Sequence, residues 1–406
     1  MRLMKSIMAA IRDPDRIKSG IGRRMQALSL AQGVRSRDNA KKGPVEVQIG
    51  ISNRCNNRCV TCWPHKKNQE AILTDKSANI FFEGNSGEVF NSADMPLDVF
   101  EAVAADLKRI GTKRIYLIGK GEPLLNPHFV EIASIVKDAG MICFVSTNGV
   151  LLSPEIMDQL IDIELDELNI SLNAASQDIY EKFHNQHKQD GLRKICESVT
   201  AGTEKKRRLG KIKPVISFSF VISSLNSHEI LDMVRLSVEC GVDKVNIARL
   251  YAFDSFSDLL MTEEQNEVFN SRLGEVRSLL DARGIAHNVS SYIRQSQYAP
   301  DALHPSENYI RKYPCYAGWT FCVIYADGTV SPCCSSFIKL GNVNEQSFRK
   351  IWNGEKYGKF RNSALSLPKL TGNVPGCLCD RCGYINTNAE FHELLKPYRD
   401  IGYCKL

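Results

Sequence analysis

Between residue 45 and about residue 290, short β-branched and apolar runs alternate with longer stretches of helical periodicity. The predicted strands are 45–51, 114–118, 142–146, 167–172, 215–222 and 244–250. The predicted helices are 97–110, 127–139, 154–161, 176–184 extending through 192–208, 227–240 and 262–283. Repeated strand–helix units form a parallel sheet covered by helices. Six strands are two short of a full barrel, so we predict an α/β fold, a partial (β/α)6 TIM-like barrel that works at the carboxyl ends of its strands.

After residue 300 the alternation stops and cysteines become frequent. We predict a hairpin over 320–332 with an Asp327-Gly328 turn, and a helix over 347–360. A small domain with so little apolar core needs a metal to hold it together. The predicted parts are an N-terminal arm (1–44), the barrel (45–290), the cysteine-rich domain (300–390) and a tail (391–406).

The first 44 residues are a basic arm. They hold 11 Lys or Arg and three acids, a net charge of +8, whereas the whole chain has a net charge of +6. The rest of the chain therefore carries −2, which argues against a nucleic-acid binder. Apolar residues recur on one helical face over 4–11 and again over 17–28. A basic amphipathic arm can contact an anionic membrane or a partner, and the plainer interpretation is that it packs on its own domain.

The 14 cysteines gather in two groups. We find no signal peptide at the N-terminus and no apolar run near the ~20 residues of a membrane helix. Clustered cysteines in such a chain indicate metal or catalytic sites rather than disulfides. We therefore expect a cytoplasmic protein with no transmembrane segment.

The first group is Cys55-Asn-Asn-Arg-Cys59-Val-Thr-Cys62, directly after the first predicted strand. Three thiolates in one loop can bind three irons of a four-iron cluster and leave the fourth iron open. Zinc would instead need a fourth protein ligand, for which His65 is the candidate. Spacing alone leaves both metals open. The polar insert 68–94 that follows is a predicted lid or substrate loop.

Three more motifs follow the next three predicted strands. They are Gly119-Lys-Gly121-Glu122-Pro123, Ser146-Thr-Asn148-Gly149 and Ser171-Leu-Asn173. In this order, and together with the three cysteines, they resemble the motifs of the radical S-adenosylmethionine (SAM) superfamily. The first resembles the motif that meets the SAM amino group. The third resembles the one that meets the ribose, with Asn173 in place of the usual Asp.

The resemblance implies two sets of site residues. Cys55, Cys59 and Cys62 are the implied catalytic residues and ligands of a 4Fe-4S cluster that binds SAM. His184 stands near the place where the family often has an Arg for the SAM carboxylate, and Arg249 is another candidate. The implied SAM-binding residues are Gly121, Glu122, Ser146, Asn148, Ser171, Asn173 and Arg249. The implied chemistry is reductive cleavage of SAM to a 5′-deoxyadenosyl radical, which takes a hydrogen atom from a substrate. The implied electron donor is a reductant such as flavodoxin or ferredoxin.

The second group of cysteines also carries a resemblance. The Cys315-x12-Gly328-x4-Cys333 spacing, Gly341-Asn342, Ile351-Trp352 and Cys379-x2-Cys382 resemble the SPASM/twitch extension of radical SAM enzymes. It implies one auxiliary 4Fe-4S cluster, held by Cys315, Cys333, Cys379 and Cys382. Cys377 or Cys334 could replace one of these ligands, Cys322 is expected in the core, and a structural zinc ribbon is the alternative from spacing.

Four cysteine ligands favour an auxiliary cluster that accepts an electron. We therefore predict oxidation (dehydrogenation) or epimerisation of a small biosynthetic intermediate, such as a sugar or aminocyclitol. An epimerase would also need a hydrogen donor such as Cys322 or Cys334. The alternative is a maturase that cross-links or epimerises a ribosomally made peptide or a protein side chain. A more distant alternative is a metal-stabilised binding protein without catalysis.

Overall fold

The computed structural model describes residues 27–40, 42–62, 93–185, 190–250, 254–298, 310, 312–370 and 372–401. Residues 1–26 of the predicted arm, residues 68–92 of the predicted insert, and His65 lie outside these described residues. The barrel motifs and the cysteines of both groups up to Cys382 lie within them.

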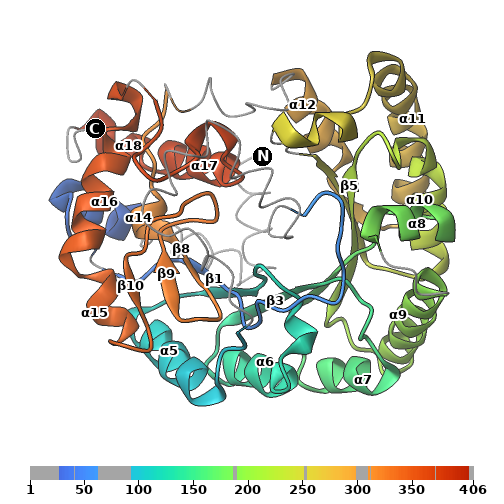
Figure 1. Cartoon of the computed structure of the whole chain (residues 1–406), viewed down its shortest axis with the longest axis horizontal. Coiled ribbons are helices and arrows are strands. Elements are labelled where there is room, and N and C mark those ends of the chain that lie inside the picture. Colours follow the sequence, from blue (N-terminus) through green and yellow to red (C-terminus); the bar gives the residue numbers. More distant parts are fainter. Residues whose placement is uncertain are drawn as a thin grey trace, which may run out of the picture.

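The described strands form one curved sheet, in the order β10-β9-β8-β1-β2-β3-β4-β5-β6-β7. They are β1 (Glu46–Ile49), β2 (Arg114–Leu117), β3 (Ile142–Thr147), β4 (Glu167–Ser171), β5 (Val215–Ile222), β6 (Lys244–Arg249), β7 (Ala286–His287), β8 (Phe321–Ile324), β9 (Thr329–Ser331) and β10 (Gly341–Asn342). From β1 to β7, neighbours in sequence pair in parallel. Figure 1 shows the helices arranged in an arc outside this sheet. The predicted partial barrel is confirmed, with the short strand β7 added at one edge.

The helices that follow the barrel strands are α5 (Leu97–Ile110), α6 (Phe129–Asp138), α7 (Pro154–Asp162), α8 (Gln177–His184), α9 (Gly191–Arg208), α10 (Ile230–Glu239), α11 (Glu263–Ala282) and α12 (Val289–Tyr298). Short 3-10 turns are η1 (Pro123–Leu125), η2 (Ser227–Glu229) and η3 (Asp254–Leu259). The C-terminal part holds α14 (Ala317–Thr320), α15 (Phe348–Trp352), α16 (Glu355–Leu365), η4 (Leu367–Lys369), η5 (Cys379–Arg381), α17 (Ile385–Leu394) and α18 (Lys396–Asp400). No helix among the described residues has the length and apolar character needed to cross a membrane.

The barrel strands have one face that is mainly apolar and one face that carries polar residues. In β5, Ile216, Phe218, Phe220 and Ile222 are buried in the hydrophobic core. The residues between them are Ser217, Ser219 and Val221, and they belong to the opposite face because successive side chains of a strand alternate. Small polar residues therefore face the inside of the barrel, while apolar residues pack against the helices.

Two predicted helices are interrupted. The stretch 176–208 is divided because Asn185 ends α8 in the left-handed conformation, with φ of 45°. The stretch 347–360 becomes α15 and α16, which are separated at Gly354. A Cβ at Gly354 would lie 3.1 Å from the Lys350 carbonyl oxygen, so the turn between these helices favours glycine. We expected 176–184 to extend into 192–208, and α8 and α9 match these two ranges without that continuation. The break at Gly354 was missed.

The cysteine-rich part continues the barrel sheet. β8 pairs in parallel with β1, and β9 and β10 follow it in antiparallel pairing. The predicted hairpin is present with shorter strands, and Gly328 in its turn has φ of 82°. Buried Arg361 donates to the carbonyl oxygens of Asp38, Gly318 and Trp352. The last residues of the N-terminal arm are therefore packed against the C-terminal part.

Candidate active site

The loop after β1 brings the first three cysteines to the carboxyl end of the sheet. Cys55 is exposed, and Cys59 and Cys62 are half-buried. The loop packs closely on the loop after β2. A Cβ at Gly119 would lie 2.5 Å from the Gly50 Cα, and one at Gly121 would lie 2.3 Å from the Arg54 carbonyl oxygen. Glycine is required at both positions because the two backbones touch.

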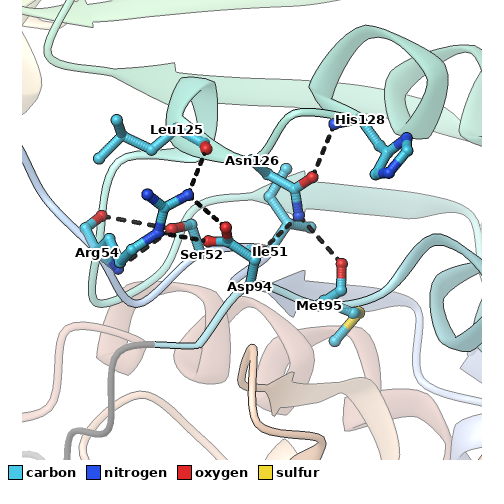
Figure 2. A network of polar contacts seen from close by, with 8 residues as sticks. All are labelled: Ile51, Ser52, Arg54, Asp94, Met95, Leu125, Asn126 and His128. Carbon is cyan, nitrogen blue, oxygen red and sulfur yellow. Dashed lines mark hydrogen bonds and ion pairs between the residues drawn. The ribbon is translucent and has the colours of Figure 1, made fainter.

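A network of polar contacts fixes the start of this loop (Figure 2). The Asn126 side chain donates to the carbonyl oxygens of Ile51 (2.8 Å) and Met95 (3.1 Å). The Arg54 guanidinium pairs with Asp94 and donates to the Leu125 carbonyl oxygen at 2.7 Å. Side chains from the second strand's loop and from the segment before α5 thus hold the backbone that leads into Cys55.

Glu122 joins the second motif to the third. Its carboxylate is buried and accepts hydrogen bonds from the backbone nitrogens of Leu124 and Asn148 and from the Thr147 hydroxyl, at 3.2, 2.7 and 2.6 Å. Burial raises its pKa, while these three donors act in the opposite direction. The Asn148 side chain continues the connection, because its Nδ2 donates to Asn56 Oδ1 at 2.7 Å and lies 4.0 Å from Cys55 Sγ. The structure therefore brings Cys55, Gly121, Glu122 and Asn148 together.

His184, at the end of α8, contacts the cysteine loop directly. Its Nδ1 lies 3.1 Å from Cys59 Sγ, and its Nε2 donates to the Leu172 carbonyl oxygen at 3.0 Å. Burial lowers the pKa of His184 to about 4, although the Leu172 carbonyl opposes the shift. Burial also raises the pKa of the Cys59 thiol. The His184 ring thus lies against the sulfur of one of the three predicted cluster ligands. The sequence pointed to the SAM carboxylate for His184 and missed this contact, which depends on where α8 ends.

Ser146 and Ser171 belong to a polar row inside the barrel. Asn169 Nδ2 donates to Ser146 Oγ at 3.0 Å, and Asn169 Oδ1 accepts from the hydroxyls of Ser217 and Ser219. Ser171 is in register with Ser219. Asn169, Ser217 and Ser219, which complete this row, were not among the predicted site residues. Their signal in the sequence is a set of polar residues at alternate positions of otherwise apolar strands.

Asn173 and Arg249 lie at the carboxyl ends of β4 and β6, with β5 between them in the sheet. Asn173 is in the left-handed conformation, with φ of 57°, and its Oδ1 accepts from the Val221 backbone nitrogen at 2.8 Å. This bond ties Asn173 to β5. Arg249 is in register with Ile222 and shares the side of β6 on which Val245 and Ile247 are buried. Their roles in binding SAM stay predictions.

The residues of the loop fit an iron–sulfur cluster with SAM. Three thiols lie within eight residues, and thiolates are the ligands of such clusters. The Nδ2 of Asn56, between two of them, is buried without a hydrogen-bond partner among the described residues. Nowhere in the described part of the chain do three His, Cys, Asp or Glu side chains converge on one point as a single metal ion requires. A cluster does not require this, because each cysteine binds a different iron.

A second cysteine site lies in the C-terminal part. Five cysteines line one cavity, and most of the other lining residues are apolar. The cysteines are Cys315, Cys333, Cys377, Cys379 and Cys382. Cys334 is not among the lining residues, and Cys322 is buried within β8, as expected for a core residue. Burial raises the pKa of the Cys315 thiol to about 12, and the neighbouring Cys379 adds to the shift. Such thiols lose their protons when a metal binds.

The fifth cysteine leaves the ligand set open. The Cys377 thiol interacts with those of both Cys333 and Cys379. The Cys377 backbone nitrogen donates to the Val374 carbonyl oxygen, which closes a turn. The four predicted ligands, Cys315, Cys333, Cys379 and Cys382, all line the cavity. The structure thus brings the predicted set together without separating it from Cys377.

Comparison with known families gives two matches. Residues 49–237 match the Radical SAM superfamily, and residues 315–383 match SPASM, an iron-sulfur cluster-binding domain. These matches indicate a SAM-binding 4Fe-4S cluster at the first cysteine site and an auxiliary cluster at the second.

Individual proteins agree with these matches. The tungsten-containing aldehyde ferredoxin oxidoreductase cofactor-modifying protein of Pyrococcus furiosus is 26% identical over 365 residues, which cover 84% of this chain and 89% of that protein. The AdoMet-dependent heme synthase of Methanosarcina barkeri is 27% identical over 260 residues, 62% of this chain and 71% of that protein. In fold, the chain is similar to the crystal structure of Streptococcus suis SuiB, with a TM-score of 0.58 and 14% identity over 88% of this chain and 80% of SuiB. The chain is therefore an enzyme of the radical SAM superfamily with a C-terminal SPASM domain.

Proposed function

We propose that this enzyme oxidises a small biosynthetic intermediate and that the electron removed from the substrate leaves through the auxiliary site. Oxidation of an alcohol to a ketone removes one hydrogen atom, one further electron and one proton. When bound, SAM and its cluster supply a 5′-deoxyadenosyl radical that can take the hydrogen atom. The chain must provide acceptors for the electron and the proton.

The second cysteine site is the observation that carries this proposal. Its cavity offers five thiols, which is enough to ligate every iron of a four-iron cluster with protein sulfur. The surrounding wall includes Phe360, Leu367 and Val374. Full cysteine ligation within an apolar wall favours a cluster that accepts an electron over one that binds the substrate at an open iron.

Lys120 is our candidate for the proton acceptor. It lies inside the motif after β2, and its Nζ is 3.9 Å from the centre of the Tyr325 ring, in the turn after β8. Lys120 thus belongs to the motif predicted to bind SAM, and its side chain contacts the auxiliary domain. Burial lowers its pKa to about 8, Asp327 opposes the shift, and Lys339 adds to it. A neutral amine is therefore accessible near neutral pH, as proton abstraction requires.

The side chains inside the barrel favour a polar substrate. The row formed by Ser146, Asn169, Ser217 and Ser219 carries hydroxyl and amide groups and no charge. These groups suit the hydroxyls of a sugar or aminocyclitol. The two relatives described above are named for modifying a cofactor and for synthesising heme, which agrees with a small-molecule substrate.

The experiment combines a substrate panel with isotopes. Anaerobically reconstituted enzyme is given SAM, dithionite and deuterated sugars, aminocyclitols or tetrapyrroles. We expect deuterium in 5′-deoxyadenosine and a product three mass units lighter than the deuterated substrate, because one deuterium and one hydrogen are lost. The matched variants are Cys315→Ser, at the auxiliary site, and Cys196→Ser, on α9.

The first variant should abolish the oxidised product, and the second should leave it unchanged. A product of unchanged oxidation state would contradict the proposal and favour epimerisation. Deuterium transfer only from a labelled peptide would instead favour the maturase.

A further inference from the structure

A groove on the surface of the C-terminal domain carries three lysines. It has a volume of about 280 Å³ and lies between α16, the segment around Leu340 and the segment around Val374. Lys339, Lys356 and Lys359 line it, and all three are exposed. Figure 1 places α16 on the outer left side of the molecule, away from α9 on the right.

The chain segment that supplies most of the groove lining differs in charge from the rest of the protein. Residues 336–370 hold seven Lys or Arg and two Glu, a net charge of +5, whereas residues 45–406 as a whole carry −2. Arg361 is the one buried member of the seven. The ion pair between Lys359 and Glu355 joins two exposed groups, so it offsets little of this positive potential. A concentrated basic surface on an otherwise weakly acidic body attracts acidic macromolecules.

The floor of the groove is shared with the auxiliary site. Phe360 and Val374 line the groove on one side and the cavity of the five cysteines on the other. A macromolecule docked in the groove would be separated from that cavity by a single layer of side chains. Electron transfer becomes faster as the distance between redox centres falls, so this position suits exchange of electrons.

We propose that this groove is the docking surface for a small acidic electron-transfer protein that exchanges electrons with the auxiliary site. The inference rests on the proposed oxidation, in which one electron per substrate must leave the enzyme. That electron passes to the oxidised flavin or iron–sulfur centre of the docked protein, which is reduced by one electron. An acidic peptide substrate is the competing occupant. The shared floor favours the redox partner, because a peptide must be modified at the barrel.

The test uses full-length enzyme with Cys55→Ala/Cys59→Ala/Cys62→Ala, so that only the auxiliary cluster is loaded. The cluster is reduced with dithionite, freed of excess reductant and mixed in a stopped-flow cell with an oxidised acidic flavodoxin. We compare Lys356→Glu/Lys359→Glu with Lys194→Glu/Arg208→Glu, which changes the net charge equally on α9. Lys339 is kept because its charge acts on Lys120.

We expect the groove variant to slow reoxidation by flavodoxin at least about tenfold at low salt, because charge complementarity chiefly sets the association rate. The rate of the parent enzyme should fall as salt is added. The control variant should stay within about twofold of the parent, since its charges lie far from the site. Reoxidation by a small uncharged quinone should be equal in all three proteins, which shows that the cluster is intact.

Equal rates for the groove and control variants would overturn the inference. The groove substitutions would also be tested in enzyme with intact cysteines, with dithionite as the reductant. A raised KM for a peptide there, together with unchanged reoxidation by flavodoxin, would overturn the inference. An oxidised product formed without docking of flavodoxin would refute the docking inference but not the proposed oxidation. Docking without an oxidised product would refute the proposed oxidation and leave the surface assigned.

Discussion

The two cysteine sites of this enzyme are built in opposite ways. At the barrel mouth, three cysteines come from eight consecutive residues, and Cys55 is exposed. In the auxiliary site, five cysteines come from three separate segments and line one cavity with apolar walls. The first site is held by hydrogen bonds from the surrounding loops, whereas the second lies inside the core of its own domain. An open site suits a reacting centre, and an enclosed one suits electron storage and structural support.

The largest expected effect comes from emptying the first site. Cys55→Ala/Cys59→Ala/Cys62→Ala should lower the iron content from about eight to about four per chain. It should leave the melting temperature within about 2 °C, because the loop is fixed by Arg54 and Asn126 rather than by the cysteines. Iron analysis and calorimetry check this. A large loss of stability would show that the first cluster also supports the fold.

Lys120 connects the two sites, and its removal should have the next largest effect. Lys120→Gln should lower turnover about 100-fold, the usual contribution of a general base. In the parent enzyme, turnover should rise with pH through about 8, where the amine becomes neutral. Lys108→Gln on α5 is the matched control. If the pH profile survives in Lys120→Gln, another group takes the proton.

Emptying the auxiliary site should change stability more than emptying the first. Cys315→Ala/Cys382→Ala should lower the melting temperature by about 5–10 °C, since metal binding contributes to the folding free energy. Cys334→Ala, next to the cavity, should stay within about 2 °C of the parent. Equal stability of both variants would mean that the domain is held by its apolar core alone, and the contrast between the two sites would fail.

Substitution of Arg361 tests how strongly its hydrogen bonds stabilise the C-terminal part and its contact with the N-terminal arm. Its guanidinium is fully buried and donates to three carbonyl oxygens. Arg361→Met should reduce the free energy of unfolding by about 3 kcal/mol, because the carbonyls of Gly318 and Trp352 in buried contacts and the part-buried carbonyl of Asp38 lose a partner. Exposed Arg349→Met should change it by less than about 0.5 kcal/mol. Denaturant titration of both variants measures the difference, and similar values would show that Arg361 is dispensable.

The same contrast explains what could be predicted from the sequence. The barrel strands were visible as β-branched runs, and the spacing of Cys55, Cys59 and Cys62 predicted one loop, where the structure places them. The pairing of β8 with β1 could not be predicted, because it joins strands about 275 residues apart and leaves no local signal.

Side-chain contacts between residues far apart in the sequence could not be predicted either. The contact between His184 and Cys59 depends on the left-handed Asn185 that ends α8, inside a stretch that reads as continuous helix. In the auxiliary site, five cysteines compete for four irons, and spacing cannot decide among side chains that line the same cavity. The sequence is most informative where a site lies within one segment.

The most direct test of the account is SAM cleavage in enzyme with about eight irons per chain, as two four-iron clusters require. Parent enzyme, Cys315→Ala/Cys382→Ala and Cys55→Ala/Cys59→Ala/Cys62→Ala are incubated anaerobically with SAM and dithionite. We predict 5′-deoxyadenosine from the first two proteins and none from the third. No 5′-deoxyadenosine from fully loaded parent enzyme would contradict radical chemistry at the barrel mouth.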